Sequence, residues 1–319
     1  MRELPEKPQD GYPSIYLEGT DAPLPEKLHP GTRYMHFKTI AKGGKSVIQS
    51  CLDRHLARVV CWKQLKPEFE DDPLEQRRFV REARVSASLQ HPNVIPVYEL
   101  GRDARGKLYF TMKLVQGFTL RDLFAPDYRE RYDLGQLVDV LVQVAFALRY
   151  AHSHGVVHRD VKPENVLVGP YGEVLLMDWG LAKVWREDGS SEDLPAPDVD
   201  PDAAATTLTG AGKLEGTIAY MSPEQLRRAP EIDHRTDVYS LGVALYEILA
   251  RRAPFEGRTI SEMTARIESE VPPLPSACTA SLVPPPLEAL AMRCLAKDPV
   301  ARPAGCREVV RELQGGWER

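Results

Sequence analysis

Residues 158–165 of this 319-residue chain read His-Arg-Asp-Val-Lys-Pro-Glu-Asn, and this octet decides the fold. A polar turn in which Asp160 and Asn165 cap helices would explain two of the eight residues. It would not explain why a lysine and a Pro-Glu pair stand between them in this order. The octet therefore indicates a functional loop rather than a simple turn.

Two shorter motifs follow the octet in the sequence. Asp178-Trp179-Gly180 follows the apolar strand Val174-Met177, and Ser222-Pro223-Glu224 comes further along the chain. An aspartate and a glycine at the end of a strand usually form a turn, so the first motif is weak when it is taken alone. Its spacing behind Asn165 gives it weight.

Together, these three motifs resemble the eukaryotic-like serine/threonine protein kinase family, and most of all its bacterial branch. The resemblance covers nearly the whole span from Tyr34 to Leu313. It implies an α+β chain with the bilobal protein kinase fold, in which a small N-lobe has a five-stranded antiparallel sheet plus one helix and a larger C-lobe is mainly helical. On this basis, residues 34–115 form the N-lobe and residues 116–319 the C-lobe, with an activation segment at 178–224.

Hydrophobic periodicity predicts the same kinds of element. Short runs rich in β-branched residues predict strands at Phe37-Ile40, Val47-Leu52, Val59-Leu65, Ile95-Leu100 and Leu108-Val115. One-sided apolar spacing predicts helices at Pro73-Leu89, Leu134-His154, Thr236-Arg251, Leu287-Lys297 and Arg307-Leu313. Residues 1–33 are rich in proline and show no sustained period, so we expect a leader that lies on the surface or is disordered.

Charge and cysteine content exclude some classes of function. The net charge is −5, so the chain has no basic field that would hold nucleic acid, and we expect no nucleic-acid partner. The five cysteines show neither Cys-x-x-Cys spacing nor a zinc-like match to the histidines. We therefore expect reduced, packed thiols.

Apolar segments give no sign of export or of a membrane span. The N-terminal residues contain no apolar signal-peptide core, and we expect a cytoplasmic protein. The longest apolar stretches, around residues 137–148 and 238–250, are interrupted by polar residues and fall short of the ~20 residues that a span needs. We expect them to be core helices.

Phosphoryl transfer from ATP needs a cover over the phosphates, a cation on them, metal ligands and a carboxylate that aligns the attacking hydroxyl. The resemblance implies that Asp160 accepts the hydrogen bond of that hydroxyl, that Lys162 neutralises the γ-phosphate, and that Asn165 completes the loop. Thr217, in a run that resembles the family's end of the activation segment, should hydrogen-bond toward Asp160 and Lys162. A lysine at position 162 resembles the pattern of kinases specific for serine and threonine.

The resemblance also implies ATP and Mg²⁺ as cofactors, with Mn²⁺ as the alternative metal. Asn165 and Asp178 match the family's metal ligands. Lys63 matches the lysine that pairs with the α- and β-phosphates, and Glu82 matches the helix residue that holds it. The other residues expected around ATP are Ile40, Gly43, Gly44, Ser46, Ile48, Cys61, Met112, Lys113, Val115 and Leu167.

The predicted phosphate-covering loop at residues 41–48 departs most from the family. Ala41 and Ser46 stand where the family has glycine, and only Gly43 is kept. A side chain at such a position hinders the close approach of backbone to phosphate. Ser46 could still donate its hydroxyl, and Lys42 and Lys45 add positive charge near the triphosphate.

Four further residues match positions that support the active site in the family, and these are Arg159, Glu224, Asp237 and Arg302. We expect Glu224 and Arg302 to form a buried ion pair, and Asp237 to hold the backbone of the octet. Arg159 directly precedes Asp160, an arrangement associated with control by autophosphorylation of the activation segment. The candidate phosphosites are Thr206, Thr207 and Thr209, although solvated hydroxyls without such a role explain them equally well.

Proteins with serine or threonine acceptors are the expected partners, and self-association would serve trans-autophosphorylation. A pseudokinase scaffold with weak or no catalysis is the main alternative, and Ala41 and Ser46 suggest it. Small-molecule phosphotransferases of a related fold share the loop aspartate and the metal aspartate. They usually lack the Ser/Thr-Pro-Glu segment and its arginine partner, which are both present here.

Overall fold

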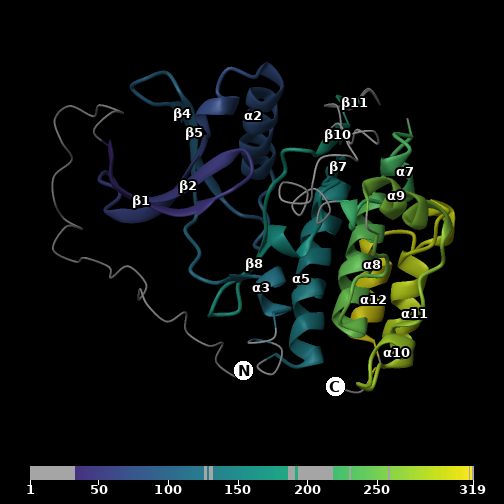
Figure 1. Ribbon diagram of the computed structural model, residues 1–319. Helices are drawn as coiled ribbons and strands as arrows, with labels where there is room; N and C mark the ends of the chain where they lie inside the picture. Colours follow the sequence, from purple (N-terminus) through teal and green to yellow (C-terminus); the bar gives the residue numbers. More distant parts are fainter. Residues whose placement is uncertain are drawn as a thin grey trace. The chain divides into compact units, whose positions relative to one another are not determined.

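The structure is a computed structural model that describes residues 33–125, 128, 132–185, 191–192, 218–229, 231–257, 259–315 and 317 (Figure 1). The described chain divides into two compact units. The first unit takes in residues 33–90, 94–117 and 169–173, and the second takes in residues 91–93, 118–168 and those from 174 onward. Except for Arg33, the predicted leader lies outside the described residues.

The first unit is built on a five-stranded antiparallel sheet in the order β1-β2-β3-β5-β4. Its strands are β1 (Tyr34–Lys42), β2 (Ser46–Asp53), β3 (Arg58–Leu65), β4 (Val97–Arg102) and β5 (Leu108–Met112). The sheet confirms the predicted fold class for this part of the chain. The first three strands form a meander, but a helix follows β3 in the sequence, and the chain then re-enters the sheet at the far edge. For this reason β5, and not β4, pairs with β3.

Helix α2 (Pro73–Ser88) begins at a clear start signal. The Asp72 carboxylate accepts hydrogen bonds from two backbone N–H groups of the first turn, at 2.8 and 3.3 Å. Phe79 of the helix packs on Phe110 of β5, with ring centroids 4.9 Å apart. This aromatic contact fixes the helix on one face of the sheet.

The opposite face of the sheet has a hydrophobic cluster of its own. Its buried members are Tyr34, Cys51, Val60, Trp62 and Tyr109. Trp62 stacks on Tyr109 with centroids 3.7 Å apart. Because side chains alternate along a strand, Cys61 and Lys63 point to the face that α2 covers.

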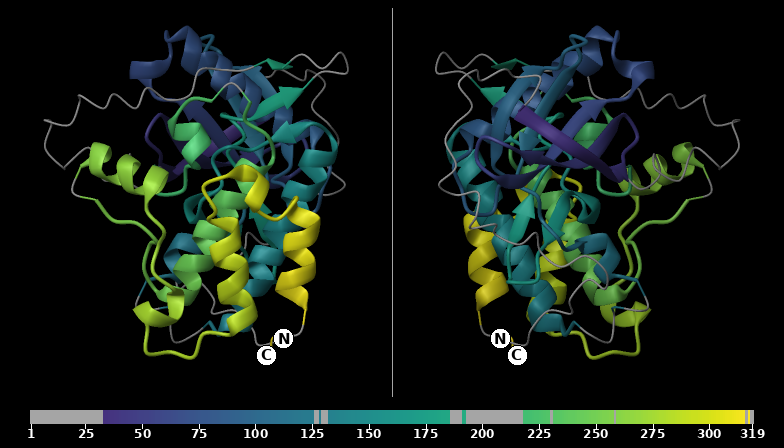
Figure 2. Two further views of the ribbon diagram at one scale, coloured as in Figure 1. Left: turned by 90° about the vertical axis from the view of Figure 1, so that its right-hand side faces the viewer. Right: turned by 90° about the vertical axis from the view of Figure 1, so that its left-hand side faces the viewer.

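The second unit is mainly helical. Its longer helices are α5 (Leu134–Ser153), α8 (Arg235–Ala250), α9 (Ile260–Ser269), α11 (Pro285–Cys294) and α12 (Cys306–Gln314). The shorter ones are α3 (Leu120–Leu123), α7 (Pro223–Leu226) and α10 (Pro275–Cys278). Helix α8 contacts α5 and α11, and α12 contacts α5 and α11, so these helices run side by side (Figures 1 and 2).

Two small sheets of the second unit bracket the octet. One contains β6 (Phe118–Thr119), β8 (Val166–Val168) and β9 (Val174–Leu176), and the other contains β7 (Val156–Val157), β10 (Lys183–Trp185) and β11 (Ser191–Glu192). The octet runs from the end of β7 to the start of β8. Strands at both ends therefore fix the path of residues 158–165.

Helix α5 is the core helix predicted from the apolar stretch near residue 140. By length and composition alone it could cross a membrane, since its most apolar window has a mean hydropathy of 1.3. More than half of that window is buried inside the protein, and α8, α12, β7 and β9 pack against the helix. Buried core helices of water-soluble proteins have the same composition. The five cysteines are free thiols, and all but Cys278 are buried.

Candidate functional site

The octet brings three of the predicted catalytic side chains together. The Lys162 ammonium donates to both carboxylate oxygens of Asp160, at 2.8 and 2.7 Å. The Asn165 amide nitrogen donates to the Asp160 backbone carbonyl at 2.8 Å and to its carboxylate at 3.0 Å. Because the nitrogen of this amide faces Asp160, its oxygen faces away and is left for another partner.

Asp237 on α8 holds the backbone at the start of the octet. Its carboxylate, fully buried, accepts hydrogen bonds from the N–H groups of His158 and Arg159 at 2.9 and 2.8 Å. A third bond joins it to the His152 ring on α5 at 2.8 Å. Burial alone would raise the pKa of Asp237, but the bond to His152 lowers it, so the carboxylate stays charged. Arg159 adopts a left-handed φ of 65°, a conformation that the Asp237 contact helps to maintain.

His158 connects the octet to the Asp-Trp-Gly motif. Its Nδ1 accepts from the Asp160 N–H at 3.1 Å, so Nε2 carries the hydrogen and donates to the Met177 carbonyl at 3.1 Å. Its ring lies against the Trp179 indole, with centroids 4.4 Å apart. Trp179 is completely buried, so it fills the position of the large apolar residue in this motif.

Asp178 emerges beside the octet. The N–H of Met177 donates to the Asn165 carbonyl at 3.0 Å, which fixes the residue before Asp178 on the octet. Asp178 itself has a φ of 66°, which is unusual for a residue other than glycine. The structure therefore presents both predicted metal ligands, Asn165 and Asp178, from neighbouring backbone segments.

The pKa of Asp160 reflects its burial, a neighbouring lysine and a neighbouring carboxylate. Burial raises the pKa of its carboxyl above the ordinary value; Lys162 acts to lower it, and the charge of Asp178 raises it further. Burial also acts to lower the pKa of Lys162, but the Asp160 carboxylate outweighs this effect and raises it. The Asp178 carboxylate thus lies close enough to Asp160 for the two negative charges to repel one another.

Oxygen donors on neighbouring backbone segments are the ligands that Mg²⁺ and Mn²⁺ prefer. The protein donors would be the Asn165 amide oxygen and the Asp178 carboxylate. Within the described ranges, no group of three His, Cys, Asp or Glu side chains is arranged to hold a metal ion. A metal here would accordingly need oxygen ligands from a phosphate and from water as well, which is usual for Mg²⁺.

The Ser-Pro-Glu motif opens helix α7 and supports the octet from a second direction. Ser222 and Gln225 form a capping box, and the Gln225 amide nitrogen donates to the Arg159 carbonyl at 2.8 Å. Glu224 accepts two hydrogen bonds from the Arg302 guanidinium, at 2.6 and 2.8 Å, and the Arg302 side chain is fully buried. The predicted ion pair thus anchors the helix from which Gln225 reaches the octet.

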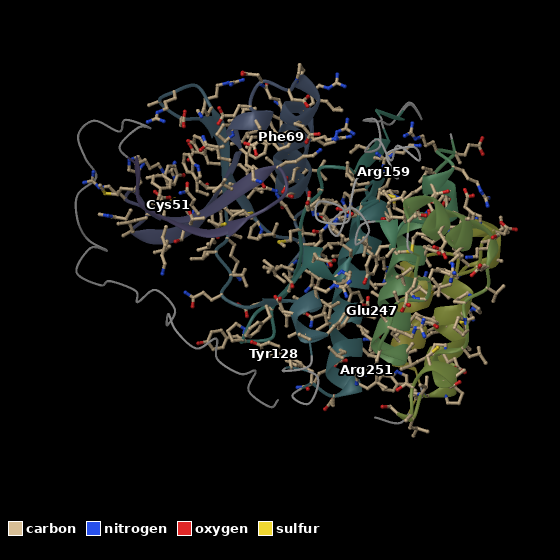
Figure 3. All side chains as sticks on the ribbon, in the orientation of Figure 1. Cys51, Phe69, Tyr128, Arg159, Glu247 and Arg251 are labelled. Atoms are coloured by element: carbon tan, nitrogen blue, oxygen red, sulfur yellow. The ribbon has the colours of Figure 1, made fainter. Side chains whose placement is uncertain are left out.

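A second polar cluster borders the octet, and sequence reasoning missed it. Arg121 on α3 donates to Glu164 of the octet at 2.8 Å, and also to Glu247 on α8 and to the Tyr220 hydroxyl. Tyr220 in turn donates to Glu247. Figure 3 labels Glu247 and Arg159 within the second unit. The partners are far apart in sequence, so no local pattern could have indicated this cluster.

In the first unit, Lys63 and Glu82 form an ion pair. The Lys63 ammonium donates to both oxygens of the Glu82 carboxylate, at 2.5 and 2.7 Å, and both side chains are almost buried. Along the sheet, Lys63 lies directly opposite Ile48 on β2, and Cys61 lies opposite Met112 on β5. These four predicted nucleotide residues therefore share the face of the sheet that α2 covers.

The remaining predicted nucleotide residues are spread over several elements. Ile40 on β1 is half exposed, at 47%. The backbone N–H of Lys113 is occupied by the Pro96 carbonyl at 3.0 Å, and Val115 follows the end of β5. Leu167 lies on β8 and belongs to the second unit.

The turn between β1 and β2 differs from the expectation in one respect. Gly43 donates its N–H to the Ser46 carbonyl at 2.8 Å, which closes a tight turn. Lys45, expected near the triphosphate, reaches Glu75 on α2 at 2.6 Å. The side chain of Lys42, along with Thr217 and the candidate phosphosites Thr206, Thr207 and Thr209, lies outside what the structure describes.

Comparisons with known proteins agree with this geometry. A family model described as "Protein kinase domain" matches residues 34–313. The serine/threonine-protein kinase PknD of Protochlamydia amoebophila is 33% identical over 297 residues, which cover 89% of this chain and 30% of that protein. The proteins of the same name from Chlamydia felis and Chlamydia pneumoniae are 32% and 33% identical, over 90% and 88% of this chain. The chain spans under a third of the length of these curated relatives.

Proposed function

Since the chain belongs to the protein kinase domain family, we propose that it transfers the γ-phosphate of ATP to serine and threonine hydroxyls of protein substrates. The observation that carries this proposal is the set of hydrogen bonds that holds Asp160 between Lys162 and Asn165. The names of the relatives, which are serine/threonine-protein kinases, support the same acceptors.

Asp160 is the residue that would receive the acceptor hydroxyl. Its carboxylate is fixed in place by Lys162 and Asn165, so an incoming hydroxyl meets an oriented hydrogen-bond acceptor. The raised pKa of Asp160 makes it a better proton acceptor than an ordinary aspartate. Lys162, next to that carboxylate, would place its positive charge by the phosphoryl group in transfer.

Asn165 and Asp178 would hold Mg²⁺ through one amide oxygen and one carboxylate. When bound, the metal would neutralise charge that develops on the phosphate oxygens. The protein's part is to keep these two donors at a fixed place, and the bond between the Met177 N–H and the Asn165 carbonyl does so.

The first unit supplies the residues for the nucleotide. Lys63, held by Glu82, would pair with the α- and β-phosphates. Because Pro96 occupies the N–H of Lys113, adenine recognition falls to the Lys113 carbonyl and to the backbone of Leu114 and Val115.

Autophosphorylation of the activation segment is our proposal for control. Arg159 directly precedes Asp160, and its guanidinium donates to the Leu181 carbonyl at 2.8 Å, near the start of that segment. Incubation with Mg-ATP should therefore add phosphate at Thr206, Thr207 or Thr209 and raise the rate. Mass spectrometry would test this control, and a fully active protein without phosphate on those residues would refute it.

A pseudokinase scaffold is the second candidate, since Ala41 and Ser46 replace glycines of the family. The β1–β2 pairing also shifts register between Thr39 and Ala41, where the chain approaches this turn. Such a protein would act by binding partners, with weak or no transfer of phosphate.

Transfer of labelled γ-phosphate to a generic basic protein would separate the two functions. The intact chain should transfer phosphate, whereas Asp160→Asn and Lys63→Met should lose nearly all transfer. Circular dichroism would show that both variants fold. Equal residual signal from the three proteins would reject an active kinase.

We also propose a cytoplasmic location and self-association during autophosphorylation. Free, buried thiols are typical of reducing compartments. Cell fractionation would test the location, and recovery in a secreted fraction would contradict it. A rate of autophosphorylation that is independent of protein concentration would contradict the self-association.

A further inference from the structure

Lys45, at the tip of the β1–β2 turn, is attached to helix α2. Its ammonium lies 2.6 Å from a carboxylate oxygen of Glu75. The Lys45 side chain is 47% exposed, but that of Glu75 is only 8% exposed. The same Glu75 oxygen also accepts from Arg78 at 2.5 Å. Burial in this setting fixes the position of the carboxylate, and so Glu75 is a firm attachment point for the turn.

Glu75 and Glu82 lie on the same side of α2. They are seven residues apart, which is about two helical turns, so their side chains share one face. Glu82 pairs with Lys63 in the middle of the sheet, and Glu75 pairs with Lys45 at the turn. Two ion pairs thus connect the helix to the sheet, one on the predicted phosphate lysine and one on the predicted phosphate cover.

The backbone of the turn is held as well. The N–H of Lys66 donates to the Lys45 carbonyl at 2.9 Å, and the Lys66 ammonium donates to the Gly44 carbonyl at 2.8 Å. The Lys45 ammonium also lies 5.9 Å from the centre of the Phe69 ring, which Figure 3 labels. Among these contacts, the one with Glu75 connects the turn to α2.

We propose that Glu75 is a positioning residue for ATP: through Lys45 it holds the β1–β2 turn on helix α2, so that the turn and the Lys63–Glu82 pair keep one fixed arrangement. This inference rests on the proposed function. Glu75 touches no reacting group, so its loss should raise the KM for ATP and leave kcat nearly unchanged.

A simpler electrostatic role predicts the opposite sign. If Glu75 only screened Lys45, Glu75→Gln would add net positive charge near the phosphates and would tighten ATP binding. Positioning predicts weaker binding, because a more mobile turn loses more conformational entropy when it closes on the nucleotide. The direction of the change in Glu75→Gln therefore separates the two roles.

The test compares the intact chain with Glu75→Gln, Lys45→Met and Lys45→Arg. A control variant, Glu70→Gln, removes another ion pair of the first unit, with Lys107 at 2.6 Å, that does not involve the turn. Steady-state kinetics give KM and kcat, and binding of ATP in the presence of Mg²⁺ gives Kd. Hydrogen exchange of residues 43–46, measured without nucleotide, reports the mobility of the turn.

Glu75→Gln and Lys45→Met should weaken ATP binding about two- to fivefold, as expected for a partly exposed pair, and should speed exchange in the turn. Lys45→Arg keeps the positive charge, so its Kd for ATP and its exchange rate in the turn should match those of the intact chain. Glu70→Gln should change neither quantity. Unchanged exchange, or ATP binding that is equal or tighter in Glu75→Gln, would overturn the inference. If the intact chain binds ATP but transfers no phosphate, the proposed function fails, while exchange and Kd still decide the role of Glu75.

Discussion

Replacement of Arg302 by methionine should strongly destabilise the second unit. The Arg302 side chain is fully buried and donates two hydrogen bonds to Glu224, at 2.6 and 2.8 Å. It also donates to the backbone carbonyls of Arg235, Ala296 and Lys297. Methionine fills a similar volume but leaves the Glu224 charge and these three carbonyls without that donor.

The cost can be worked from these contacts. Removing one partner of a buried ion pair costs roughly 3–5 kcal/mol, because the remaining charge is buried and unpaired. Each carbonyl that loses its donor adds a smaller cost of about 1 kcal/mol, part of which water recovers at the surface. We therefore expect Arg302→Met to lower the free energy of unfolding by at least about 4 kcal/mol.

Urea unfolding followed by circular dichroism would measure this change. Arg252→Met is the matched control, because Arg252 pairs with Glu256 at 3.2 Å with both side chains at least half exposed. That variant should cost less than about 1 kcal/mol. A loss below about 1 kcal/mol in Arg302→Met, or losses that are equal in the two variants, would refute the reasoning.

Three further predictions concern the octet and the turn. Burial acts to lower the pKa of His152, but the Cys306 thiol and Asp237 raise it to about 10. The bound proton therefore stabilises the folded state fully below about pH 6.5, the pKa of an unfolded histidine, and this contribution is lost as the pH rises towards 10. The unfolding free energy should then fall by about 1 kcal/mol per unit between pH 7 and 10; a slope that His152→Gln keeps would contradict this cause. Ser46→Gly should lower the KM for ATP or raise kcat. Kinetic constants equal to those of the intact chain would contradict the view that the Ser46 side chain hinders nucleotide binding. Gln225→Ala removes the bond to the Arg159 carbonyl and should lower kcat about two- to tenfold; full activity would show that this bond is dispensable.

The octet and the pattern of predicted strands were enough to predict most of the fold from the sequence. Helix α2 was expected at Pro73–Leu89 and spans Pro73–Ser88, because Asp72 and Pro73 give an unambiguous start. Strand β1 begins three residues earlier than expected. The prediction placed the ends of this strand at the apolar residues Phe37 and Ile40. Both side chains are nearly half exposed, so they do not mark where the strand begins and ends.

Other features depend on contacts that no local pattern contains. The strands of the second unit's small sheets have only two or three residues, too few for a period to show. Arg121 finds Glu164, Tyr220 and Glu247 at separations of 43, 99 and 126 residues. The attachment of Lys45 to Glu75 depends likewise on how α2 packs on the sheet. The sequence alone had suggested that this lysine lies near the triphosphate.

Formation of phosphoserine and phosphothreonine is the most direct measure of the central claim. The assay would offer matched peptides with serine, threonine or tyrosine as the one acceptor, at saturating Mg-ATP, and mass spectrometry would give the rates. Our account predicts phosphate on the serine and threonine peptides but not on the tyrosine peptide, and a rate at least about a hundredfold lower in Asp160→Asn. Equal rates for the intact chain and Asp160→Asn would contradict it.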